Sequence, residues 1–412
     1  MPRVGVAVRD CTPRAGLAMS GFAARTEPAT GAHDPLTVRA LAVDDTVLLT
    51  VDACGLHEDF CARVRAAIPG HSVVAATHTH GGPVTMPGRL GGPLDRAYPD
   101  ALAATCVEAA HSALAAREPA TIEVGVGPDP GIARNRRRID GAVYAPLTVV
   151  RFRRPEGSSL VCVVNYPCHP VVLGADNRRW TADYPGTVRA AIEAAEPGSV
   201  GLFLTGCCGE LNTGHSAHAS VSVETSQDRT FEACERVGGR IAEAALAVPT
   251  RLSPAAGPAR GISAETDLPL RAPDPRDTAA SCTDWQRELP LAAPARQALL
   301  RGWISWAEDV APTPMASWTA RVTVLRWGGV RLVALPGEPF SETARDITAR
   351  LPGDTLVIGY ADGCPGYIPP AGEFAHGGYE VDEAHRYYGM PAPFAEGAAE
   401  RLTELAVAIG GE

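Results

Sequence analysis

Two histidines one residue apart are the first residues in this chain whose types and spacing suggest chemistry. His78 and His80 stand in AATHTHGGPV (75–84), between an apolar run and a pair of glycines. Side chains at positions i and i+2 of an extended segment point the same way. Both imidazoles can therefore face one cavity and contact a metal or a substrate. The alternative is a pair of hydrogen-bonded structural histidines, but the glycine-flanked setting favours function.

Three further donor residues follow apolar runs that read as strands. His169 lies between two prolines in VVNYPCHPVVL (163–173), and Glu338 lies in VALPGEPF (333–340). Tyr367 lies in DGCPGYIPP (362–370), and Tyr379 follows it. Taken alone, a glutamate in a turn is usually solvated. Four donors that each follow a strand could instead converge on one metal ion.

Other reactive side chains are more ambiguous. Glu210 in FLTGCCGELNTG (203–214) could be structural or catalytic, and we interpret the adjacent Cys207 and Cys208 as packing residues. ARNRRR (133–138) is typical of a solvated basic run, although one arginine could turn inward.

Two common metal-hydrolase patterns do not fit. A metallo-β-lactamase would continue H-x-H-x-D-H, but Gly82 and Pro83 occupy the last two places. An amidohydrolase barrel needs eight βα units, which this pattern does not supply.

Five motifs in order carry a resemblance to a known family. THTHGGP, NYPCHP, GCCGELN, LPGEPF and GYIPP…GGYE together resemble the catalytic domain of the neutral/alkaline non-lysosomal ceramidases, from about residue 3 to 390. The resemblance implies one zinc ion held by His78, His169, Glu338 and Tyr367. It also implies that His80 transfers protons. The other candidate catalytic residues that we carry over are Arg136, Tyr379, Tyr388, Glu210 and Asn212.

The sequence departs from the family at two positions near the site. Glu210 to Thr213 stand where the family has a loop with a serine implicated in activity, and Gly81 replaces the serine after THTH. We also expect neither a leader peptide nor the C-terminal immunoglobulin-like domain of the large ceramidases. These departures favour a substrate smaller or more polar than ceramide.

The chemistry follows from the donor types. Two neutral imidazoles, a carboxylate and a phenol suit zinc, which keeps an open position when it is catalytic. Zinc lowers the pKa of bound water to about 7. His80 would take the water proton and return it to the leaving amine, while Tyr379 or Arg136 would stabilise the oxyanion. We therefore expect hydrolysis of an N-acyl amide. The alternatives are an ester or lactone hydrolase, an acyl-transfer or cyclising enzyme, and a protein in which zinc only braces the fold.

The pattern of apolar runs and turn residues around these side chains predicts an α/β fold with mixed sheets and flanking helices, in one catalytic domain over 1–412. The residues 37–53 read as a hairpin around Asp44 and Asp45. We expect helices at 58–68, 99–117, 184–195 and 230–248, and strands at 71–77, 146–153, 160–166 and 200–206.

Residues 321–367 repeat the plan of residues 37–83. Each copy has a hairpin with a two-residue turn, a loop, a helix, a Pro-Gly break and a strand that ends in a Gly-Pro loop. If this pseudo-repeat is real, the loops of the two copies can converge.

The Pro- and Ala-rich segment 250–315 has weak periodicity, and we predict an inserted loop or lid there. This segment contains Trp285, Trp303 and Trp306, and Trp318 follows it. These four tryptophans could form the roof of a pocket or be ordinary core residues.

Composition excludes several partners. The formal charge of −10 argues against nucleic acid and stable anchoring to an anionic membrane, and no apolar run could span one. All basic charge is arginine, so lysine nucleophiles are excluded. The eleven cysteines contain no CxxC pair, and with no export signal expected we predict reduced thiols and a cytoplasmic protein. The partner that we expect is a small N-acyl compound. The oligomeric state stays open.

Overall fold

Three segments of the chain fold to one plan. The computed structural model describes residues 1–216, 226–254, 257–272 and 275–411. In each segment three antiparallel strands lead through a helix to a fourth strand, which runs parallel to the third, and a second helix follows. The bounds of the first unit are β1 (Arg3–Asp10), β3 (Thr37–Val43), β4 (Thr46–Val51), α1 (Glu58–Ala66), β5 (His71–Ala76) and α2 (Ala97–Ala115).

The other two units have the same order and strand directions. The second comprises β7 (Thr121–Gly127), β9 (Leu147–Arg153), β10 (Ser159–Tyr166), α3 (Tyr184–Ala195), β12 (Val200–Thr205) and α4 (Phe231–Ala247). The third comprises β15 (Arg260–Pro269), β16 (Ser317–Trp327), β17 (Val330–Ala334), α7 (Ser341–Arg350), β19 (Asp354–Ile358) and α8 (Ala398–Gly411). The predicted pseudo-repeat is thus present in the first and third units, and the prediction missed the second.

A Pro-Gly pair precedes the fourth strand of every unit. Gly70, Gly198 and Gly353 have φ values of 81°, 84° and 80°. Glycine adopts this left-handed conformation without a steric penalty from a Cβ atom. The turn from helix to strand is therefore built in the same way three times, and EPGS at 196–199 was the sequence signal for the missed copy.

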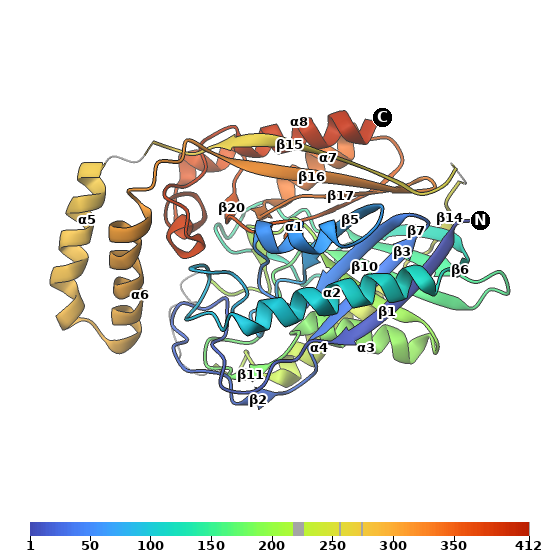
Figure 1. The fold of residues 1–412 in the computed structure, drawn as a ribbon, viewed down its shortest axis with the longest axis horizontal. Helices are drawn as coiled ribbons and strands as arrows, with labels where there is room; N and C mark the ends of the chain where they lie inside the picture. Colours follow the sequence, from blue (N-terminus) through green and yellow to red (C-terminus); the bar gives the residue numbers. More distant parts are fainter. Residues whose placement is uncertain (217–225, 255–256, 273–274, 412) are drawn as a thin grey trace.

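Each sheet is buried on both faces. In β4, Val47 and Leu49 pack with the apolar residues that face α1 and α2, while Leu48 joins a central cluster. The central cluster contains residues of all three sheets, and within it Trp327 packs against Phe152 with ring centroids 5.8 Å apart. Helices cover the outer faces, as α2 does for β1 and β3 in Figure 1. This burial explains why the strands read as continuous apolar runs.

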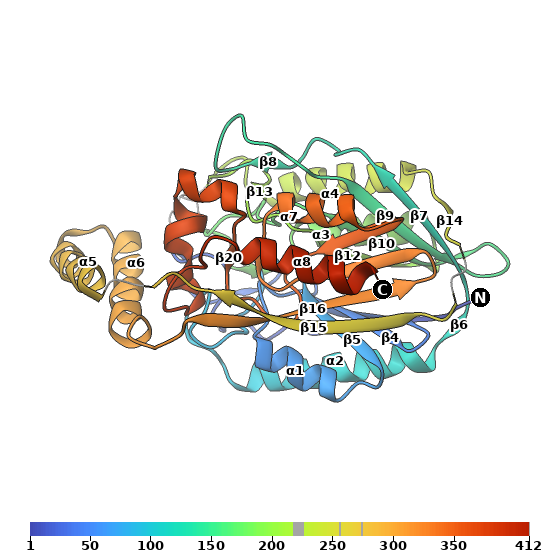
Figure 2. The ribbon, with the colours of Figure 1, turned by 90° about the horizontal axis from the view of Figure 1, so that it is seen from above.

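The segment 250–315 is not a loop, and that expectation was wrong. β15 pairs with β16 over all ten of its residues, and α5 (Pro275–Glu288) and α6 (Pro294–Ser305) stand together at one end of the molecule (Figures 1 and 2). β15 is an edge strand with mostly half-exposed side chains, so its residues show little alternation. A role of this segment as a lid stays a prediction.

The fourth strands of the three units end beside one another. Ala75 forms a bridge with Ala361, and Gly206 forms one with Ile358. The Thr205 hydroxyl donates to the carbonyl of Thr77 at 2.7 Å. The loops that leave β5, β12 and β19 therefore meet at one place. Among the helices of the described residues, none has the length and apolar character needed to cross a membrane.

Candidate metal centre and active-site pocket

Three buried side chains, each attached to a different unit, meet beside these loops, since the N–H of His169 bonds the carbonyl of Leu211 and that of Glu338 bonds the carbonyl of Gly366. His78 follows β5, His169 follows β10 and Glu338 follows β17. Their potential ligand atoms all lie within 4.8 Å of one another. Glu338 Oε2 is 2.9 Å from Nε2 of His169 and 3.5 Å from Nε2 of His78. The structure therefore brings together three of the four predicted ligands in a group that could hold a metal ion.

Backbone carbonyls orient both imidazoles. Nδ1 of His78 is 2.5 Å from the carbonyl oxygen of Cys54, and Nδ1 of His169 is 3.0 Å from that of Leu211. Each Nδ1 therefore carries the proton, and each Nε2 presents its lone pair to the centre. His78 has a φ of 66°, which is unusual for a residue with a side chain. Strain of this kind concentrates at functional sites, where the surrounding structure holds it in place.

Glu338 is an ionised carboxylate in a fully buried position. Burial raises its pKa, but His78, His169 and the hydroxyl of Tyr388 outweigh this effect and lower the pKa to about 2. Tyr388 donates to Oε1, while the hydroxyl of Tyr360 lies 3.4 Å from Oε2. Burial also lowers the pKa of His78, to about 4, against the attraction of Glu338. The site thus combines the neutral imidazole of His78 and a second imidazole with a negative carboxylate, which is a suitable donor set for a divalent cation.

Tyr367, the fourth predicted ligand, borders the cluster. Its hydroxyl is 3.4 Å from Nε2 of His169 and 2.8 Å from Nη2 of Arg136. Burial raises the pKa of Tyr367, and the charge of Arg136 opposes that effect. Tyr367 is thus placed to contribute an oxygen to an ion bound by the other three.

Arg136 belongs to a buried ionic network. It donates to Glu380 at 2.8 Å and to the carbonyl of Gly209 at 2.8 Å. Arg137 bridges Glu380 and Glu373. The side chains of Arg136 and Arg137 are therefore buried, two arginines rather than the one that the sequence allowed to turn inward, whereas Arg134 and Arg138 of the same run are exposed. Arg136 therefore links the hydroxyl of Tyr367 to Glu380 and to the backbone of Gly209.

His80 lies at the edge of the cluster and faces the pocket. Its Nε2 is 3.3 Å from Nε2 of His78, and its ring lies edge-on to Phe22 at 4.7 Å. Burial is the main cause that lowers the pKa of His80 well below its usual value, so the ring is neutral at pH 7. Gly21 permits this packing, because a Cβ there would lie 2.5 Å from the His80 ring. A neutral imidazole beside the cluster is able to accept a proton.

The remaining predicted residues fall into two groups. Tyr388 contacts Glu338, and Tyr379 packs against Tyr367 with ring centroids 5.8 Å apart. Glu210 instead accepts hydrogen bonds from the backbone and hydroxyl of Ser341 at the start of α7. Asn212 holds the turn to His215 through its side-chain amide. Glu210 therefore stabilises a helix end, and its carboxylate contacts no predicted ligand among the described residues.

Sequence analysis missed two contributors to this site. Tyr360 stacks on His78 at 4.0 Å, and its hydroxyl is 3.2 Å from Sγ of the buried Cys208. Arg229 lines the pocket just before α4. Tyr360 lies two residues after β19, as His78 lies two residues after β5, so a comparison of the two copies of the pseudo-repeat could have found it. Nothing in the sequence around Arg229 indicates a functional residue.

The pocket at this site is narrow, and His80 is part of its wall. Its walls include Phe22, Leu90, Val171, Tyr367 and Tyr379. None of the four tryptophans is part of its lining. Trp285, Trp303 and Trp306 surround the guanidinium of Arg386 instead, at 5.2–5.6 Å from the ring centroids.

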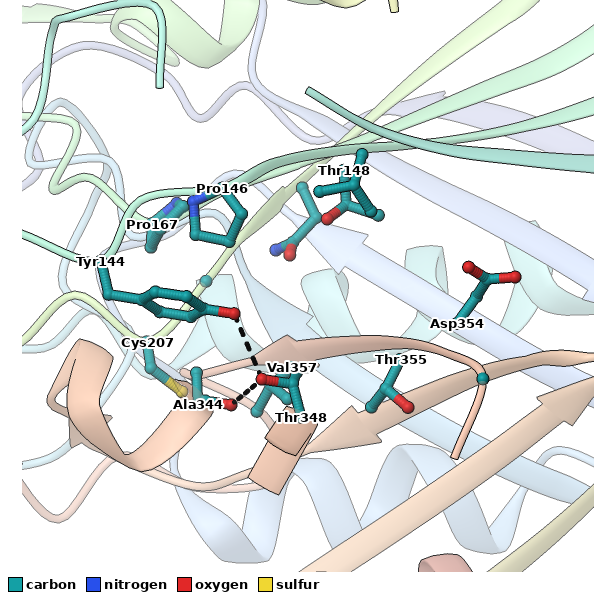
Figure 3. A pocket seen from close by; sticks show the side chains of 14 residues that line it. Tyr144, Pro146, Thr148, Pro167, Cys207, Ala344, Thr348, Asp354, Thr355 and Val357 are labelled. Atoms are coloured by element: carbon teal, nitrogen blue, oxygen red, sulfur yellow. Dashed lines mark hydrogen bonds between the residues drawn. The ribbon is translucent and has the colours of Figure 1, made fainter. Parts of the chain in front are cut away.

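A second cavity, between the second and third units, has a different character. Figure 3 shows Tyr144 and Thr348 across it, with their hydroxyls 3.2 Å apart. Thr348 also donates to the carbonyl of Ala344 at 2.9 Å. None of the predicted catalytic or metal-binding residues lines this cavity.

Comparison with known proteins identifies the fold. No protein-family model and no curated protein sequence matches the chain. Among the solved structures that match it, two have a TM-score of 0.75 each. One is the neutral ceramidase of Pseudomonas aeruginosa, at 18% identity over 100% of this chain and 74% of that one. The other is a ceramidase complexed with C2, at 17% identity over 100% of this chain and 75% of that one. The chain thus has the neutral ceramidase fold, as the motifs predicted.

Proposed function

We propose that this protein is a zinc-dependent hydrolase that cleaves an N-acyl amide bond. The observation that carries the proposal is the buried cluster of His78, His169 and Glu338 on a ceramidase fold. Both imidazoles direct Nε2 to the carboxylate, so the residues fit a zinc ion, with Tyr367 as a further oxygen donor. Bound zinc would lower the pKa of water and polarise the carbonyl group of the amide.

The protein's own residues would move the proton. His80 is neutral, it lines the pocket, and its Nε2 lies 3.3 Å from Nε2 of His78. It would take a proton from the attacking water and pass it to the nitrogen of the leaving amine. This transfer makes the amine a neutral leaving group, as general acid–base catalysis requires.

The negative charge that develops on the carbonyl oxygen needs a hydrogen-bond donor. Tyr379 lines the pocket, and its hydroxyl has no hydrogen-bond partner among the residues that the structure describes. Arg136 is committed to Glu380, Gly209 and Tyr367. We therefore assign oxyanion stabilisation to Tyr379 and positioning of Tyr367 to Arg136.

Metal analysis combined with a turnover assay tests the proposal. We expect about one zinc ion per chain in the wild type, and loss of zinc and of amide hydrolysis in the double variant His78→Ala, His169→Ala. His111→Ala is the control, because His111 lies on the exposed side of α2 and bonds the carbonyl of Ala67. Full zinc content in the double variant would refute the ligand assignment. Zinc without turnover of any amide would mean that the metal braces the fold.

A further inference from the structure

One wall of the active-site pocket carries a positive charge that the metal chemistry does not use. Arg229 lines the pocket together with His80, and its guanidinium lies 5.5 Å from the centroid of Phe22. The same Phe22 ring packs edge-on against His80 at 4.7 Å. A single aromatic ring therefore separates the guanidinium from the proposed proton shuttle.

The hydrogen bonds of Arg229 fix its position without neutralising it. Nη2 donates to the carbonyls of Leu173 at 2.9 Å and Val171 at 3.2 Å, and Nε donates to that of Val172 at 3.4 Å. No carboxylate lies within ion-pair distance of it in the part of the chain that the structure describes. Nη1 has no partner among those residues either. The group is thus anchored on one edge and free on the other.

The neighbouring ionisable groups leave this charge in place. Arg136, the other arginine of the pocket wall, is paired with Glu380. Burial and the charge of Arg229 lower the pKa of His215 to about 4, so its ring is neutral. Asp183 uses both carboxylate oxygens on backbone N–H groups of residues 172–173 and 184. Burial lowers the pKa of Arg229, while Asp183 and Asp176 oppose that shift from beyond ion-pair distance.

We propose that Arg229 binds a carboxylate of the substrate, so that the natural substrate is an N-acyl compound with a free carboxylate. This inference rests on the proposed function and narrows its substrate class. One guanidinium with one uncommitted nitrogen offers a single charge, which suits a monoanion. An anion desolvated beside such a cation forms a charge-assisted hydrogen bond.

A matched pair of probes tests this assignment. N-octanoylglycine and N-octanoylglycinamide differ only in the group that Arg229 would bind, which is a carboxylate in the first and an uncharged carboxamide in the second. We expect the wild type to prefer the carboxylate, and Arg229→Gln to lower the ratio of the two kcat/KM values about 10- to 100-fold, the range for a hydrogen bond to a charged group. Arg229→Lys, which keeps the charge, should retain most of the preference. Arg240→Gln is the control, because Arg240 is exposed and bonds the carbonyl of Pro130 outside the pocket.

A structural role would lower both kcat/KM values equally and leave their ratio unchanged, and that result would overturn the proposal. A wild type that prefers the neutral amide would do the same. If neither probe is hydrolysed, the proposed function fails. Calorimetric binding of the two probes to the zinc-loaded protein then tests whether Arg229 binds a carboxylate. Preferential binding of N-octanoylglycine that Arg229→Gln abolishes would support the carboxylate site, and equal binding would refute it.

Discussion

The hydroxyl of Tyr388 donates a hydrogen bond to Oε1 of Glu338, the oxygen of that carboxylate that does not face His169. The two residues lie 50 positions apart in the sequence, and both are buried. This bond leaves Oε2 directed at the two imidazoles, and it helps to keep the pKa of Glu338 low. Partners of this kind orient metal ligands and tune their affinity.

We therefore predict that Tyr388→Phe weakens zinc binding. Loss of the donor should raise the pKa of Glu338 and allow its side chain to turn, so that zinc affinity falls roughly 10- to 100-fold. Competition with a chromogenic chelator measures this affinity. The adjacent Tyr387→Phe is the matched control, because the hydroxyl of Tyr387 accepts a hydrogen bond from Trp303 instead. Equal zinc affinity in Tyr388→Phe and the wild type would contradict the prediction.

For His80, we predict that substitution by alanine lowers the rate but leaves the metal in place. The expected loss of kcat is roughly 10²–10⁴-fold, the usual range for a general acid–base catalyst. Zinc content should remain near that of the wild type, because His169 and Glu338 still flank His78. Elemental analysis and steady-state kinetics on the same preparation check both statements. If zinc and activity disappear together, His80 is a ligand and not a proton shuttle.

The stability of the protein should depend on pH through Glu210. Burial raises the pKa of this carboxyl group from 4.5 to about 7, against the hydrogen bonds from Ser341. Between those two values the unfolded chain releases the proton while the folded chain keeps it. The wild type therefore loses stability as the pH rises through this window, by about 3 kcal/mol in total.

Glu210→Gln removes this titration and keeps an acceptor for Ser341. The thermal unfolding midpoint of the variant should exceed that of the wild type increasingly from about pH 4.5 to about pH 7, and by a constant margin above it. Ser341→Ala offers an independent check, because loss of its hydroxyl should raise the pKa of Glu210 further and widen the window. A midpoint difference that does not vary with pH would show that Glu210 is not the titrating group.

Ceramide should be a poorer substrate than a short N-acyl amino compound. The net charge of −10 would be repelled at an anionic bilayer, where ceramide resides. The pocket is narrow and carries the charge of Arg229 on its wall, whereas ceramide is uncharged. Assays of micellar ceramide and short N-acyl compounds at matched concentrations compare kcat/KM directly. A higher value for ceramide would restore a plain ceramidase interpretation.

Local patterns anticipated much of the fold. The hairpin around Asp44 and Asp45 forms as predicted, and α3 spans the expected residues 184–195. Hydrophobic periodicity and turn residues are local properties, so they can be read from neighbouring positions alone. β15 was not predicted, because the sequence of a partly exposed edge strand shows little alternation of apolar and polar residues. This strand forms by pairing with β16, which lies more than 40 residues away.

The sequence alone determined which groups are available for chemistry and that they follow strand ends: two imidazoles at 78 and 80, one at 169, the carboxylate at 338 and the phenol at 367. Only the tertiary structure decided which of these groups meet. The segments that follow β5, β10 and β17, in three separate units, meet at one point, and so His78, His169 and Glu338 converge while Glu210 turns to the start of α7. Convergence of this kind depends on the packing of whole sheets around a shared core, and short-range spacing does not encode it. The same packing places Arg229, from a segment with no distinguishing motif, on the wall of the active-site pocket.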